Sequence, residues 1–105
     1  MDFEQKPWGF EYTWADTPLY SAKMMVVKEN NQTQYVYYKK MDITIFVLQG
    51  EIVLYEEGKN RTLIQGEKYH ISPKIMYRII ALKSDATILQ VSSPIVENDL
   101  VIVEA

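Results

Sequence analysis

The sequence contains no cysteine and a single histidine, and its apolar segments are short. The absence of cysteine excludes disulfides, thiolate catalysis and the common zinc clusters, and it is typical of a reducing compartment. No apolar run approaches the roughly 20 residues that cross a bilayer. The opening Met1–Gln5 is acidic, where a signal peptide would be basic and then apolar. We therefore expect a cytoplasmic protein with no membrane partner.

Basic residues are also too few and too scattered to form a nucleic-acid interface. The chain has 11 Lys and Arg against 14 Asp and Glu, a net charge of -3, and no stripe of positive charge that could follow phosphates. Nucleic acid is therefore not expected as a partner. A length of 105 residues suits one core, because a chain of this size buries about 65% of its unfolded surface. We expect a single domain over residues 1–105.

Short segments rich in Val, Ile, Tyr and Thr recur along the chain, each closed by turn residues and none with a helical period. This pattern predicts an all-β fold, either a sandwich or a closed barrel. The two-residue link Gln49–Gly50 predicts a β-hairpin, because Gly adopts the positive φ of tight turns. The predicted strands are Tyr20–Lys28, Thr33–Tyr38, Ile43–Leu48, Glu51–Glu56, Arg61–Ile64, Met76–Leu82, Thr87–Ser92 and Leu100–Val103.

The first residues predict a different kind of structure. Met1–Asp16 contains Pro7, Trp8, Gly9 and Trp14. Two Trp rings are costly to leave unpacked. We expect an irregular N-terminal arm that lies over the barrel.

The segment Gln34–Gly50 resembles the first motif of the cupin family, which reads His-x-His, three or four residues, Glu, six residues, Gly. Counting back from Gly50 places Ile43 at the position of the Glu, and Val36 and Tyr38 at the positions of the two His. The resemblance implies a single cupin-type β-barrel, also called a double-stranded β-helix or jelly roll.

The second cupin motif is similar to Gly66–Pro73 followed by Met76–Ile79, with Tyr77 at the position of the third His. More narrowly, Lys6–Glu11 and Leu89–Pro94 resemble the small cupins of the mannose-6-phosphate-isomerase type. That resemblance implies a role connected with sugar phosphates.

None of the four positions that hold the metal in this family carries a usual ligand. Val36 and Ile43 have no donor atom, and a protonated Tyr38 or Tyr77 is a poor ligand because phenols ionise near pH ~10. A lone histidine such as His70 is more often a hydrogen-bonded structural residue than a ligand. We therefore expect neither a metal nor another cofactor.

The period of two along a strand places Gln34, Val36 and Tyr38 on one face, and the resemblance implies that this face meets Ile43 and Tyr77 inside the barrel. These five residues are the candidate substrate-binding site. The Gln34 amide could bind a sugar hydroxyl, and Tyr38 and Tyr77 could stack on a sugar ring. The alternative is that the same residues simply fill the core. Two further residues near the barrel mouth, Lys39 and Lys40, could meet a phosphate.

Three functions remain open, and no catalytic residue is assigned. The first is a non-catalytic module that binds a sugar or sugar phosphate, or serves as an accessory subunit. The second is a metal-independent sugar-phosphate or nucleotide-sugar isomerase or epimerase, and the third is a metal-dependent isomerase with unusual ligands.

A homodimer is also expected. Ile43–Leu48 is apolar on both faces, with Thr44, Phe46 and Leu48 opposite the pocket-facing residues, and we expect Tyr35 and Tyr37 to extend that outer face. An exposed apolar patch of this kind is commonly buried in a symmetric contact. The resemblance implies the same, since related cupins pair in this way.

Overall fold

A computed structural model describes residues 2–104, and all of its regular elements are strands, as predicted. The described part of the chain has no helix that is long and apolar enough to cross a membrane. The strands are β1 (Phe3–Lys6), β2 (Gly9–Asp16), β3 (Ser21–Val27), β4 (Asn31–Gln32), β5 (Tyr35–Tyr38), β6 (Ile43–Gln49), β7 (Glu51–Glu56), β8 (Lys59–Ile64), β9 (Lys68–Ile71), β10 (Tyr77–Ala81), β11 (Ala86–Ser92) and β12 (Leu100–Glu104).

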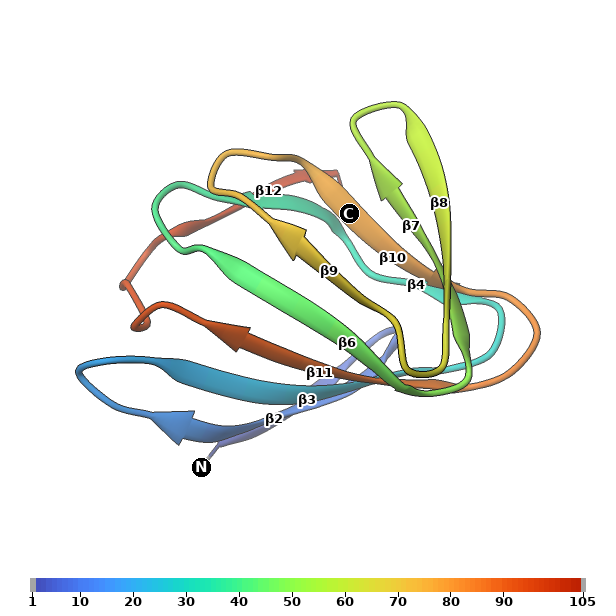
Figure 1. The fold of residues 1–105 in the computed structure, drawn as a ribbon, viewed down its shortest axis with the longest axis horizontal. Coiled ribbons are helices and arrows are strands. Elements are labelled where there is room, and N and C mark those ends of the chain that lie inside the picture. The colour runs from blue at the N-terminus through green and yellow to red at the C-terminus, as the bar shows by residue number, and fades with distance from the viewer. Residues whose placement is uncertain (1, 105) are drawn as a thin grey trace.

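The strands form two antiparallel sheets that face each other (Figure 1). The first sheet has the order β1-β2-β3-β11-β6-β9, and the second has the order β12-β5-β10-β7-β8, with β4 paired to β10. The chain changes sheet at seven of its connections: β3–β4, β5–β6, β6–β7, β8–β9, β9–β10, β10–β11 and β11–β12. This arrangement is the predicted cupin-type jelly roll.

Alternation along the strands places the core between the sheets. In β6, Ile43, Ile45 and Val47 are at most 2% exposed, whereas Thr44 and Phe46 face outward. In β10, the buried residues of the facing sheet are at positions 77, 79 and 81. Full burial of one aliphatic side chain contributes about 1.5–3 kcal/mol, so these inward positions supply much of the drive to fold.

The predicted hairpin at Gln49–Gly50 is wrong. The strands on its two sides, β6 and β7, belong to different sheets, so this link is a corner at which the chain changes sheet. Gly50 has φ +85°, and a Cβ there would lie 2.6 Å from the backbone oxygen of Asp85. The glycine is required for a close approach rather than for a hairpin turn.

The predicted irregular N-terminal arm is also wrong for the described residues; Met1 lies outside them. β1 and β2 form a hairpin, and β2 pairs with β3 along its length. Trp8 is buried as expected, but Trp14 is 53% exposed. The outward positions of β2 carry aromatic residues and its inward positions carry Glu11 and Thr13. This reverses the usual pattern of apolar residues inward and polar residues outward, so the strand was not predicted from the sequence.

Two smaller differences concern strands of the middle of the chain. The short strands β4 and β9 were not predicted. Tyr35 and Tyr37 lie on β5 in the second sheet, whereas Ile43–Leu48 lies in the first. The predicted extension of the outer apolar face onto Tyr35 and Tyr37 is therefore wrong.

Candidate ligand-binding site

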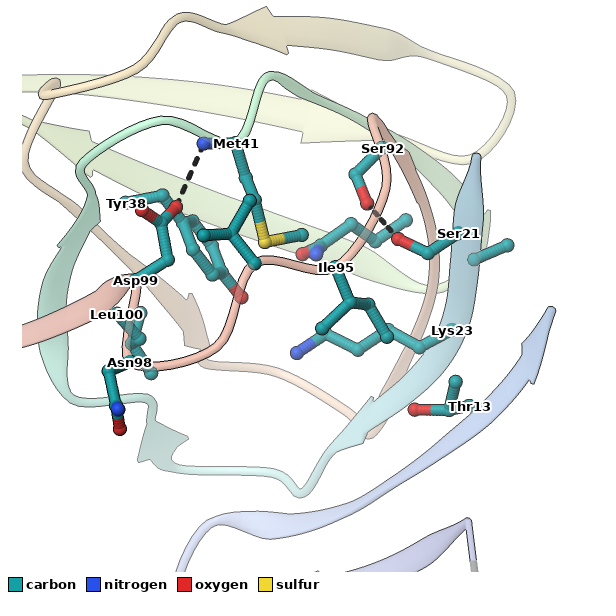
Figure 2. A pocket seen from close by; sticks show the side chains of 13 residues that line it. Thr13, Ser21, Lys23, Tyr38, Met41, Ser92, Ile95, Asn98, Asp99 and Leu100 are labelled. Carbon is teal, nitrogen blue, oxygen red and sulfur yellow. Dashed lines mark hydrogen bonds between the residues drawn. The ribbon is translucent and has the colours of Figure 1, made fainter. Parts of the chain in front are cut away.

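A cavity of about 380 Å³ lies at the end of the barrel where the β5–β6 turn and the β11–β12 connection meet. This volume suits a small ligand. Its walls come from β2, β3, β5, β11, the start of β12 and the two connections named above, and Figure 2 shows their side chains around it. The polar lining includes Thr13, Ser21, Lys23, Tyr38, Gln90 and Ser92.

A second depression, of about 560 Å³, lies among the turns that include Gly50, Ser84 and Asp85. It is larger in volume, but every residue that lines it is partly or fully exposed, so no buried polar group converges there. We therefore take the first cavity as the candidate site.

Lys23 is placed in the barrel by the alternation of β3. Ser21, Met25 and Val27 share its face and are at most 6% exposed, and the Lys23 side chain itself is 20% exposed. In Figure 2 its amine and the hydroxyl of Tyr38 both point into the cavity. A cationic group therefore lies on the inward face of β3, between the buried side chains of Ser21 and Met25.

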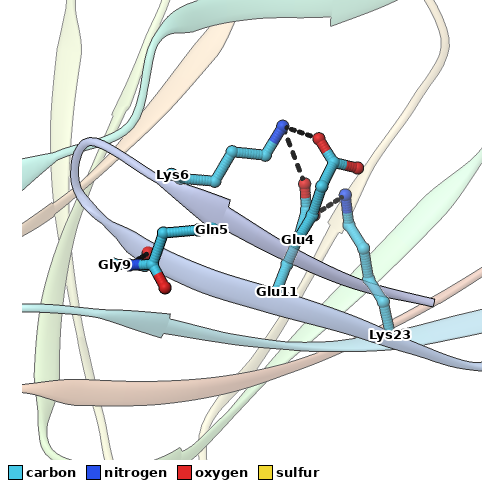
Figure 3. Close-up of polar contacts among 6 residues, drawn as sticks. All are labelled: Glu4, Gln5, Lys6, Gly9, Glu11 and Lys23. Carbon is cyan, nitrogen blue, oxygen red and sulfur yellow. Dashed lines mark hydrogen bonds and ion pairs between the residues drawn. The ribbon is translucent and has the colours of Figure 1, made fainter. Parts of the chain in front are cut away.

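Four charged residues form a continuous network beside this cavity (Figure 3). Lys23 Nζ lies 2.5 Å from Glu11 Oε2, and Lys6 Nζ lies 3.3 Å from Glu11 Oε1 and 2.7 Å from Glu4 Oε2. The Glu11 side chain is 13% exposed, whereas that of Glu4 is 67% exposed. The largely buried carboxylate of Glu11 thus forms ion pairs with the ammonium groups of both Lys6 and Lys23.

The network keeps both Lys23 and Glu11 ionised. Burial would raise the pKa of Glu11, but Lys23 and Lys6 outweigh that effect and lower the pKa below its ordinary value. Burial would likewise lower the pKa of Lys23, but Tyr38 and Glu11 together raise the pKa above its ordinary value. At neutral pH the cavity is therefore lined by an ammonium group.

Gln90 contributes an unsatisfied acceptor. It lies on the inward face of β11, is 3% exposed, and its Oε1 has no hydrogen-bond partner. Gln90 lines the cavity together with Lys23 and Tyr38. An unpaired buried carbonyl costs about 1–3 kcal/mol, so this oxygen is suited to accept a hydrogen bond from a bound molecule.

The rim of the cavity is held by hydrogen bonds of the Asp99, Ser21 and Ser92 side chains. Asp99 is 3% exposed, and its carboxylate accepts hydrogen bonds from the backbone N–H of Lys40 at 3.0 and 3.1 Å and of Met41 at 2.8 Å. Ser21 donates to the carbonyl of Ser93, which leaves the hydroxyl of Ser92 as the donor to Ser21. These contacts fix the β11–β12 connection against the β5–β6 turn and β3.

Four of the five predicted site residues line a smaller, adjoining cavity of about 50 Å³. They are Gln34, Val36, Tyr38 and Tyr77, and Glu11, Lys23 and Gln90 line the same space. A water molecule requires about 10–15 Å³ by this kind of measure, so the space admits a few waters or one small group of a ligand. Of the five predicted residues, only Tyr38 also lines the 380 Å³ cavity.

Ile43 does not line either of these two cavities. It is 2% exposed and belongs to the hydrophobic core cluster, among other residues of β6 and β10. Its side chain packs within the barrel rather than at its open end.

The metal that the cupin resemblance implies does not fit these residues. Burial first, and then Tyr38 and Glu11, raise the pKa of Tyr77 well above its ordinary value, so its phenol stays protonated. Lys23 places an ammonium in the same space, where it repels a cation. Within residues 2–104, no three His, Asp or Glu side chains come together in a way that could hold a metal ion.

The remaining polar candidates lie outside the cavity. Lys39 and Lys40 are exposed and do not line either cavity. His70 Nε2 lies 2.6 Å from Asp42 Oδ1, and both side chains are more than half exposed. This pair is a surface contact between neighbouring segments.

Glu11, Lys23 and Gln90 were missed by reasoning from the sequence. A signal exists for two of them: Lys23 interrupts the apolar run Ser21–Val27, and Gln90 interrupts Ala86–Ser92, each at an inward position of its strand. A charged or amide side chain at such a position is rarely buried without a partner. Glu11 gave no comparable signal, because its strand was not predicted.

Comparison with solved structures identifies the fold class. The chain is similar to KdgF from Halomonas sp., with a TM-score of 0.83, 21% identity, and coverage of 93% of this chain and 90% of that chain. It is similar to an RmlC-like cupin from Shewanella frigidimarina, with a TM-score of 0.79, 15% identity, and coverage of 91% and 86%. These likenesses establish the cupin fold and nothing finer.

A third solved structure carries a title that names an activity. It is a sugar phosphate isomerase of the cupin superfamily from Silicibacter pomeroyi, with a TM-score of 0.72, 12% identity, and coverage of 82% of this chain and 59% of that chain. No model of a protein family matches the sequence, and no curated protein matches it either. The mannose-6-phosphate-isomerase resemblance therefore stays a hypothesis.

Proposed function

We propose that this cupin-fold protein binds a small sugar or sugar phosphate in the 380 Å³ cavity, as a cytoplasmic binding or accessory module that needs no metal. The observation that carries the proposal is the buried, unpartnered Oε1 of Gln90 at the wall of that cavity. A sugar offers the hydroxyl donors that such an acceptor requires. Neighbouring hydroxyl groups on Ser21, Ser92 and Thr13 extend the polar wall.

Among the predicted residues, Tyr38 has the most direct role in this proposal. Its ring lies at the boundary of the two cavities and its hydroxyl points inward, so it can offer both an apolar face and a hydrogen bond. Gln34, Val36 and Tyr77 border the inner cavity, where they would surround only the innermost group of the ligand.

The test is a binding screen with a matched pair of blocking variants. Wild-type protein is titrated calorimetrically with hexoses, hexose phosphates and hexuronates. Ile95 lines the cavity and is 48% exposed, so Ile95→Trp should fill the entrance without disturbing the core. Ile64→Trp, on β8 and 52% exposed, adds the same bulk away from the cavity.

We expect at least one compound to bind wild type and the Ile64→Trp variant equally, and to lose about tenfold or more in affinity for Ile95→Trp, which is about 1.4 kcal/mol. The proposal fails if no compound of the panel binds, or if Ile95→Trp leaves every measured affinity unchanged.

A metal-independent sugar-phosphate isomerase is the second candidate. The observation that favours it is the presence of a carboxylate, Glu11, and a protonated phenol, Tyr77, on the wall of the same small cavity. The lowered pKa of Glu11 makes it a weak base, which is why binding ranks first. Turnover of an aldose phosphate to its ketose phosphate by wild type, but not by Glu11→Gln, would reverse this order.

A further inference from the structure

We infer that the cavity selects a small hydroxylated anion over a neutral sugar, with the anionic group held by Lys23 and Tyr38 and a ligand hydroxyl bound to Gln90. This inference rests on the proposed function, since it names the class of ligand that the same cavity takes. Three features of the wall carry it: the charge of Lys23, the positions of the nearby carboxylates, and the unpaired amide.

Among the described residues that line the 380 Å³ cavity, Lys23 is the only lysine or arginine. An ammonium group has three donors, and one of them is directed to Glu11. Tyr38 adds a hydroxyl donor that points toward the same space in Figure 2. Two convergent donors, one of them charged, suit the paired oxygens of a carboxylate or phosphate.

The nearby carboxylates leave part of this positive charge available. Glu11 is shared between Lys23 and Lys6, at 2.5 and 3.3 Å. Asp99 also borders the cavity, but its oxygens accept hydrogen bonds from the backbone N–H groups of Lys40 and Met41. In Figure 2 the Asp99 carboxylate points toward Met41 and away from Lys23.

Gln90 requires a hydroxyl group on the ligand. Its Oε1 is buried and unpartnered at the same wall. A ligand hydroxyl can donate to an amide oxygen and can also accept from an amide nitrogen. A hydroxyl therefore satisfies Gln90 in either orientation of its side-chain amide. A carboxylate without hydroxyl groups has no donor for Oε1 and would leave this buried acceptor unpaired.

The first experiment needs no variant. Calorimetric titrations of wild type compare glucuronate and galacturonate, and glucose 6-phosphate and mannose 6-phosphate, with glucose, galactose and mannose, and with cyclohexanecarboxylate. At least one hydroxylated anion should bind about tenfold or more tighter than its neutral hexose, because the hexose lacks the charge-assisted hydrogen bond to Lys23. The same anion should bind about tenfold or more tighter than cyclohexanecarboxylate, because cyclohexanecarboxylate has no hydroxyl for Gln90. Binding of the uronates would identify the anionic group as a carboxylate, and binding of the hexose phosphates would identify it as a phosphate.

Variants then assign the selectivity to residues. Lys23→Met should remove the preference for the anion, Lys23→Arg should keep it, and Gln90→Leu should remove the preference over cyclohexanecarboxylate. Lys39→Met, an exposed lysine at the same end of the barrel, is the matched control and should leave the preference unchanged. Thermal unfolding confirms that each variant is folded.

The outcomes separate the inference from the proposed function. If a neutral hexose binds as tightly as its anionic counterpart and Ile95→Trp blocks both, the cavity is a binding site but the inference is wrong. If Lys39→Met rather than Lys23→Met removes the anion preference, the inference is also wrong. If no compound of the panel binds wild type, the proposed function itself fails.

Discussion

Lys23 and Glu11 form an ion pair across two neighbouring strands inside the barrel, with Nζ and Oε2 2.5 Å apart. They are diagonal neighbours, because Glu11 is opposite Met25 in the register of β2 and β3, and Lys23 is opposite Thr13. Long side chains reach across such diagonals. The pair therefore depends on the register between β2 and β3, which brings a carboxylate to the only lysine on the inner face of β3.

The first prediction concerns the pH dependence of folding stability. Since the pKa of Glu11 is lower in the folded protein than its ordinary value, its contribution to stability is present above the unfolded pKa, about 4.3. It is lost as pH falls through the folded pKa. Glu11→Gln should therefore lower the free energy of unfolding by about 2 kcal/mol at pH 7, and this difference should shrink toward pH 3.

Urea unfolding of wild type and Glu11→Gln at several values between pH 7 and pH 3 measures this difference. Glu97→Gln, at an exposed position of the β11–β12 connection, controls for the loss of one surface carboxylate. A difference between wild type and Glu11→Gln that stays constant over this pH range would contradict the assignment.

The second prediction concerns the cavity rim. Asp99→Ala leaves the backbone N–H groups of Lys40 and Met41 without their acceptor, and an unpaired buried donor costs about 1–3 kcal/mol. The matched control is Asp42→Ala, which breaks a surface contact with His70 and should change stability by no more than about 1 kcal/mol. Denaturant unfolding measures both variants. Equal effects of the two substitutions would show that Asp99 does not hold the rim.

The third prediction concerns metal. Val36 and Ile43 supply no donor, and the cavity that Val36 lines also contains the protonated phenol of Tyr77 and the ammonium of Lys23, which would repel a cation. Protein purified under mild conditions should therefore contain no stoichiometric transition metal by elemental analysis. Its midpoint of thermal unfolding should not change on addition of a chelator, since a bound metal stabilises the state that binds it. One tightly held zinc, manganese, iron or nickel ion per chain would refute this prediction.

The sequence predicted the core strands well because their pattern is local. Glu51–Glu56 was predicted with the bounds it has in the structure, and Ile43–Leu48 was predicted one residue short of β6. Because Ile43–Leu48 is apolar on both faces, the motif resemblance rather than the pattern of the strand indicated which of its side chains face inward. The N-terminal hairpin could not be found in this way, because Glu11 and Thr13 occupy the inward positions of β2. In such a strand the polar side chains face the barrel and the aromatic side chains face outward.

The candidate site was harder to predict than the fold, because it depends on contacts between distant segments. The motif resemblance led to Gln34, Val36, Tyr38 and Tyr77, which line the inner cavity. The larger cavity depends on the β11–β12 connection and on the pairing of β3 with β11, which brings Lys23 opposite Gln90. Strand order and register of this kind are long-range features that the composition of each strand does not specify.

The last prediction is the homodimer, through the outer face of the first sheet. In register across this sheet, Tyr12, Met24, Leu89 and Phe46 form one row, and each lies on the side opposite the buried residues of its strand. Tyr12 is 42% exposed, and Val91 in the adjacent row is 49% exposed. Contiguous apolar surface of this kind is uncommon on monomers and is suited to a symmetric contact.

Light scattering at micromolar concentration should give twice the 12.3 kDa of the single chain. Leu89→Glu places a charge at the centre of the row and should shift the protein to the monomer. Ile64→Glu, on the second sheet, is the matched control and should not. Because burial of an unpaired carboxylate in a dimer contact is strongly unfavourable, a residual dimer in Leu89→Glu would place the contact elsewhere on the molecule. A mass of 12.3 kDa for wild type would refute the homodimer.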